Sequence, residues 1–232
     1  MSSSSYQKLR RLAPRAVRVV DRRKTESLVI AAYEQTLVPK ATTFIASYDE
    51  ATRYRATWQK EVAEGKGAVG GLVKVMHGWL PLLQRDVQGF NSAEYGDNPA
   101  VPDDVMEDAG RLHDVVTDFT DPEGKPLAYK DACLVALDAA IAAAHKEWGE
   151  ADAADKRYQN LLASVRASAE AFDLELQAFR KTLAAEGGRS DVDFQKLRAE
   201  RAQVADTEDD PNVPPAPAPV PPAPHGTTQP AQ

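Results

Sequence analysis

The sequence predicts an all-α fold: an elongated helical bundle, or coiled-coil rod, built around one helix of about 60 residues. Between Leu134 and Leu183, apolar residues recur at alternating steps of three and four, and no proline interrupts them. This period is typical of a long helix packed lengthwise on another helix. A second stripe of the same kind precedes it, and no segment shows the alternation of a β-strand. The predicted long helix, 126–186, would be about 90 Å long.

Residues 1–24 form a basic arm with a formal charge of +7, although the whole chain carries −7. Its cationic residues include Lys8, Arg10, Arg11, Arg15, Arg18, Arg22 and Arg23. Apolar residues share one helical face of the arm, and Pro14 interrupts the pattern. We predict a flexible, disordered arm. The alternative is an amphipathic segment that becomes ordered on a membrane or a partner, and the composition also matches an organellar transit peptide.

The next two helices are predicted from the second apolar stripe and from the strongly apolar run that follows it. The first covers 26–64, with Thr25 as its N-cap and a kink at Pro39, and ends at Gly65-Lys66-Gly67. The second covers 71–88 and is bent or split by Pro81, because proline cannot donate the hydrogen bond that a helix interior requires.

Three further segments complete the predicted domain, 25–205. A helix over 102–119 begins with a proline and two aspartates, which suit a helix N-terminus. The long helix follows, and a final helix over 190–205 has Ser190 and Asp193 in the spacing of a capping box. Residues 206–232 begin with four acidic residues and hold nine of the sixteen prolines, which predicts a disordered, Pro-rich tail.

Helix lengths predict a topology. A helix over 26–64 running parallel to the long helix, with the two shorter helices returning between them, would align Arg55 with Asp155. Each is the single charged break in its apolar stripe, so we predict a buried pair that fixes the register; alternatively, each lies at a stripe edge and reaches solvent. The longer helix would overhang its neighbour. Its end then offers an interaction seam to a second chain, formed by Phe172, Leu176, Phe179 and Leu183.

No set of residues indicates catalysis, a cofactor or a metal site. Residues 65–70 match G-x-G-x-x-G, but the dinucleotide motif requires a preceding strand. No histidine lies in the Glu-x-x-His spacing of helical metal sites. Cys133 is the only cysteine, which excludes an intramolecular disulfide and predicts a small core residue.

We therefore expect a non-enzymatic structural or adaptor protein that acts through helix–helix self-association or partner binding. The expected partner is a second copy or another protein. The alternative function is a peripheral membrane-surface binder that uses the basic arm. Nucleic acid is disfavoured because the acidic body would repel phosphates. No apolar run is long enough to span a membrane, and the expected location is cytoplasmic.

Overall fold

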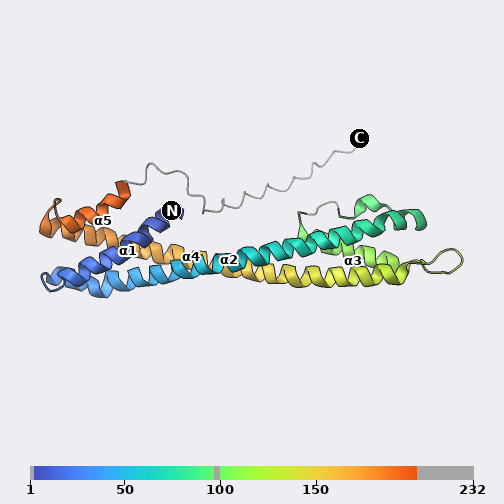
Figure 1. The fold of residues 1–232 in the computed structure, drawn as a ribbon, viewed down its shortest axis with the longest axis horizontal. Coiled ribbons are helices and arrows are strands. Elements are labelled where there is room, and N and C mark those ends of the chain that lie inside the picture. Colours follow the sequence, from blue (N-terminus) through green and yellow to red (C-terminus); the bar gives the residue numbers. More distant parts are fainter. Residues whose placement is uncertain (1–2, 97–99, 203–232) are drawn as a thin grey trace, which may run out of the picture. The chain divides into compact units, whose positions relative to one another are not determined.

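The computed structural model describes residues 3–96 and 100–202 and confirms the all-α fold within them (Figure 1). The helices are α1 (Ser3–Arg23), α2 (Leu28–Asp86), the short 3-10 helix η1 (Ser92–Glu94), α3 (Pro102–Asp118), α4 (Lys130–Gly187) and α5 (Val192–Ala202). These residues form two compact units, described separately below. Unit 1 comprises 3–38 and 175–202, and unit 2 comprises 39–96 and 100–174. The predicted tail, 206–232, lies outside the described residues.

The long helix predicted from the apolar period is confirmed. Helix α4 is continuous for 58 residues, through Gly149. Every stripe position from Leu134 to Leu183 is buried or half-buried, including Asp155. Because the exposed positions lie between them, the three-four spacing alone identified the packed side of this helix.

The predicted end of the second helix at Gly65 is wrong. Helix α2 continues without a break for 59 residues, with Pro39 and Pro81 inside it. Both prolines are exposed, so their rings lie on the side of the helix that does not pack. Packing of the opposite side offsets the lost hydrogen bonds and the poor helix propensity of the glycines.

Within unit 2, α2 and α4 are antiparallel, and the predicted parallel arrangement is wrong. The rings of Phe44 and Phe172 stack with centroids 5.8 Å apart, and those of Trp58 and Tyr158 stack at 4.6 Å. Residue numbers rise along α2 as they fall along α4. The parallel prediction required two short helices between the long ones, and α2 occupies the positions assigned to the first of them.

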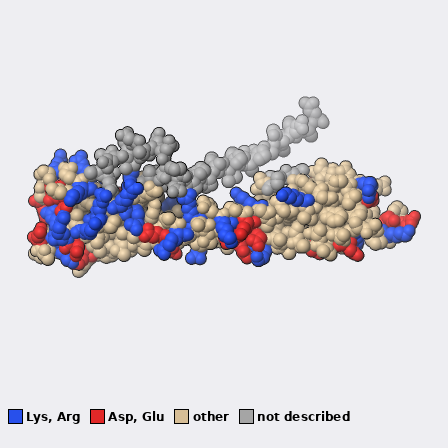
Figure 2. Space-filling model, viewed as in Figure 1, with Lys and Arg blue, Asp and Glu red and all other residues tan. Residues whose placement is uncertain are grey.

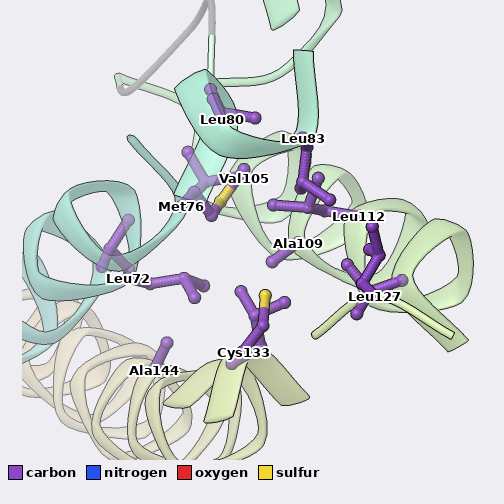
Figure 3. Packing of buried hydrophobic residues seen from close by; sticks show 13 residues of the cluster. Leu72, Met76, Leu80, Leu83, Val105, Ala109, Leu112, Leu127, Cys133 and Ala144 are labelled. Carbon is purple, nitrogen blue, oxygen red and sulfur yellow. The ribbon is translucent and has the colours of Figure 1, made fainter. Parts of the chain in front are cut away.

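An apolar cluster of unit 2 joins α2, α3 and α4 (Figure 3). Helix α3 contributes buried residues at steps of four, three and four: Val105, Ala109, Leu112 and Val116. Cys133 is fully buried in this cluster, as predicted for a core residue. Burial raises the pKa of its thiol to about 11, so the thiol is protonated and packs as a small apolar group.

In unit 1, residues 3–23 form helix α1, and the prediction of a disordered arm is wrong for them. Helix α1 contacts α5. Its apolar face is buried within the chain: Leu9, Leu12, Ala13, Ala16, Val19 and Val20 are each at most 7% exposed. The amphipathic pattern was therefore read correctly, but the surface that covers it belongs to this chain.

Two predicted N-caps also differ from the structure. At α2, the Ser27 hydroxyl accepts the backbone N–H of Ile30 at 3.2 Å, in place of Thr25. At α5, the Asp191 carboxylate accepts the backbone N–H groups of Asp193 and Phe194 at 2.8 and 3.0 Å. Both Ser and Asp are preferred caps, and which one serves depends on where the helix begins.

Across the described part of the chain, no helix combines the length and apolarity that a bilayer span requires.

Candidate docking site

A line of four arginines follows the exposed face of α1. Arg11, Arg15, Arg18 and Arg22 are separated by four, three and four residues, so they share one face of the helix. All four are exposed. We call them the arginine stripe. Figure 2 shows Lys and Arg side chains gathered over the part of the surface that belongs to α1 and α5.

A groove of about 420 Å³ lies beside the arginine stripe, within unit 1. It is lined by Arg15, Arg18, Val19 and Arg22 of α1 and by Asp193, Lys196 and Leu197 of α5. Val19 and Leu197 supply apolar surface, and both are buried. The groove therefore has an apolar part bordered by four cationic side chains and one carboxylate, a lining suited to an anionic ligand.

An ion cluster joins the end of α1 to the start of α5. Arg22 donates to Asp193, and Arg23 donates to Asp191 at 2.9 Å. Arg23 also lies 3.7 Å from Asp193 and 3.9 Å from Glu186. The Arg22 side chain is 58% exposed, whereas that of Arg23 is 17% exposed. Exposed ion pairs contribute little to stability, so the ion pairs of Arg23 stabilise the contact between α1 and α5 more than the ion pair of Arg22 does.

The pKa of two groups in the cluster is shifted. The hydrogen bond and charge of Asp193 raise the pKa of Arg22. Burial raises the pKa of Asp191, but the N–H groups of Phe194 and Asp193 and the charge of Arg23 outweigh it, so this pKa lies below its usual value. Asp191 is thus ionised at neutral pH, and in this form it pairs with Arg23 and helps to hold α5 against α1.

The lowered pKa of Asp191 predicts that acid loosens α5. A carboxyl whose folded pKa is below its unfolded pKa of about 3.9 stabilises the fold fully above that value and loses its contribution as pH falls below it. The protection of α1 and α5 amides, measured as hydrogen exchange relative to the intrinsic rate at each pH, should therefore fall below about pH 4. Asp191→Asn keeps a capping side chain but removes the charge, and should cost about 1–2 kcal/mol at pH 7. Unchanged exchange in Asp191→Asn would contradict this role.

The predicted register pair remains a prediction. The Asp155 carboxylate accepts the indole N–H of Trp58 at 2.9 Å, and Trp58 lies one turn after Arg55 on α2. Both Arg55 and Asp155 are half-buried. Asp155 therefore has a neutral donor across the α2–α4 contact, a partner that the sequence analysis did not predict.

The predicted interaction seam is not available to a second chain. Phe172, Leu176, Phe179 and Leu183 are all fully buried within the chain. In unit 2, Phe172 stacks on Phe44. In unit 1, the ring of Phe179 lies 4.9 Å from that of Tyr33. Self-association remains a prediction, but it would require another surface.

Of the basic residues predicted in the arm, the structure places four in the arginine stripe. Lys8, Arg10 and Arg23 are half-buried instead. Sequence reasoning missed Lys196 and Asp193, which come to the groove from α5, more than 170 residues after the stripe. The acidic residues around Asp191 were a signal, since they complement the two arginines that end α1.

The described residues form neither of two other sites considered from the sequence, a metal site and a phosphate-binding loop. Among the described residues, no three or more His, Cys, Asp or Glu side chains gather closely enough to hold a metal ion. The glycines of 65–70 lie inside α2 and form no phosphate-binding loop. In comparisons of this chain with protein-family models, with curated proteins and with solved structures, no match was found.

Proposed function

We propose that the chain is a non-enzymatic adaptor that binds an acidic protein surface through the arginine stripe and the adjoining groove. The observation that supports this proposal is that the two faces of α1 differ in exposure. Its apolar face is buried, while Arg11, Arg15 and Arg18 remain exposed on the other side. The cationic surface is held in place by the fold, so a partner does not have to order it on binding.

The type of cation favours a partner rich in carboxylates. Arginine presents a planar fork of donors that pairs with a carboxylate through two parallel hydrogen bonds. The charge is also segregated: residues 1–38 and 175–202 carry 14 Lys and Arg against 8 Asp and Glu. Residues 39–174 carry 14 against 23. Such a distribution accelerates encounters with an acidic surface and orients them.

A membrane surface is the weaker candidate for the same stripe. Each basic residue near an anionic membrane contributes about 1 kcal/mol, so four supply about 4 kcal/mol, which corresponds to a dissociation constant of about 1 mM. Stable attachment requires a second signal, such as inserted apolar side chains. Those of α1 are buried in unit 1, so α1 would have to detach before inserting.

The proposal is tested by titrating fluorescein-labelled poly-L-glutamate with the full chain. We expect binding that weakens as salt increases. The variant Arg11→Gln/Arg15→Gln/Arg18→Gln should reduce the affinity by about tenfold or more, because it removes three exposed charges that meet the ligand. Circular dichroism should show an unchanged helix content, since these side chains are exposed.

A matched control removes three exposed cations from unit 2: Lys60→Gln/Lys146→Gln/Lys156→Gln. It should bind poly-L-glutamate as the original chain does. Equal losses in the two variants would mean a non-specific charge effect and would contradict the proposal. Binding to phosphatidylserine vesicles without binding to poly-L-glutamate would favour the membrane alternative.

A further inference from the structure

We propose that the groove between α1 and α5 is occupied by the chain's own acidic segment, 206–210. This inference rests on the surface used in the proposed function but concerns what fills it in the free protein. The segment lies outside the described residues and contains Asp206, Glu208, Asp209 and Asp210 without any cation. The groove presents the complementary charge, with four cationic side chains against the single carboxylate of Asp193.

The length of the chain allows the segment to reach the groove. Lys196, in the groove lining, precedes the end of α5 at Ala202 by six residues, or about 9 Å of helix. Asp206 follows Ala202 by four residues and Asp210 by eight. At about 3.4 Å per extended residue, these positions extend about 14 and 27 Å from the end of α5. A chain that reverses after α5 can therefore place its carboxylates beside Lys196 and continue along α1.

Attachment to α5 gives the segment an advantage over a free acidic partner. A short tether keeps an attached ligand at an effective concentration in the millimolar range. The contacts it makes are exposed ion pairs, which are individually weak and screened by salt. Occupancy is consequently reversible. The segment reduces the affinity of the arginine stripe for weak acidic ligands, and a partner with more carboxylates displaces it.

Zero-length cross-linking of the full chain tests the location directly. A carbodiimide activates carboxylates and joins them to a lysine amine in contact. We expect a cross-link between Lys196 and Glu208 or one of its neighbouring aspartates, identified by mass spectrometry in the monomer fraction. An equal mixture of ¹⁵N-labelled and unlabelled chains should give cross-links within single copies. Mixed cross-links alone would show that the segment binds a second copy and would overturn the proposal, as would their complete absence at Lys196.

A second measurement tests whether the acidic segment competes with an acidic ligand for the groove. Neutralising the segment in the full chain, by Asp206→Asn/Glu208→Gln/Asp209→Asn/Asp210→Asn, should raise the affinity for poly-L-glutamate by about tenfold at low salt. The charge-matched control changes four exposed acids of α3: Asp103→Asn/Glu107→Gln/Asp114→Asn/Asp118→Asn. It should raise the affinity much less, because these residues do not lie in the groove. Equal increases in the two variants would overturn the proposal.

The two proposals fail in different ways. If the original and the segment-neutralised chains bind poly-L-glutamate equally well, and the arginine variant does not, the docking function stands and the internal ligand is wrong. If cross-links to Lys196 form but neither chain binds poly-L-glutamate, the segment occupies the groove and the adaptor function is wrong.

Discussion

Phe179→Ala is expected to lower the free energy of unfolding by about 3–5 kcal/mol, the range for removing a fully buried aromatic ring. Phe179 is fully buried in unit 1 and packs against Tyr33. Because the ring is covered by its own chain, the loss should be the same at low and high protein concentration. Urea unfolding followed by circular dichroism at two concentrations, a hundredfold apart, measures both quantities.

Leu174→Ala provides the matched control on the same helix. Leu174 is 70% exposed, so its truncation should change the free energy of unfolding by less than about 0.5 kcal/mol. An interface between copies would behave differently, since the stability of an oligomer rises with protein concentration. If Phe179→Ala lowered the particle mass in light scattering and left the unfolding of the monomer unchanged, the buried position of Phe179 would be wrong.

The packed side of α4 could be predicted from the sequence because burial alone determines which positions of this helix are apolar. Apolar spacing continues from Leu134 to Leu183 without a proline, and every position of that stripe is buried or half-buried. The prediction of an exposed interaction seam at the end of this helix was wrong. It depended on a long helix overhanging a shorter one, but α2 has 59 residues and α4 has 58. Helix α2 is therefore not the shorter helix that the overhang required, and the four seam residues are fully buried.

The candidate site was half visible in the sequence. The alternation of arginines and apolar residues predicted two faces for α1, and the structure places Leu9 and Leu12 inside and Arg11 and Arg15 outside. The contribution of Lys196 could not be predicted, because spacing within one helix carries no information about which distant helix packs beside it. For the same reason, the sequence could not predict that residues 3–23 form an ordered helix, because that helix packs against distant segments of this chain.

Gly65→Ala is expected to destabilise the protein by about 1–3 kcal/mol, although alanine is the better helix former. A Cβ at position 65 would lie 2.8 Å from the Cβ of Ala151 and 3.1 Å from the backbone oxygen of Glu147. The two long helices would have to separate locally to admit it. The glycine that suggested the end of a helix is therefore required inside one, for the close approach of α2 to α4.

Alanine at the neighbouring glycines should have the opposite effect on the free energy of unfolding. At Gly67 and Gly70, an added Cβ meets nothing within 4 Å, so alanine should stabilise the protein by about 0.5–1 kcal/mol at each position. Urea unfolding of the three single variants compares helix propensity with packing within about two turns of helix. Adding Ala151→Gly to Gly65→Ala should recover part of the loss, beyond the sum of the single effects, because it removes the nearest contact. If Gly65→Ala stabilised the protein as Gly67→Ala does, propensity alone would govern this segment, and the close approach would be wrong.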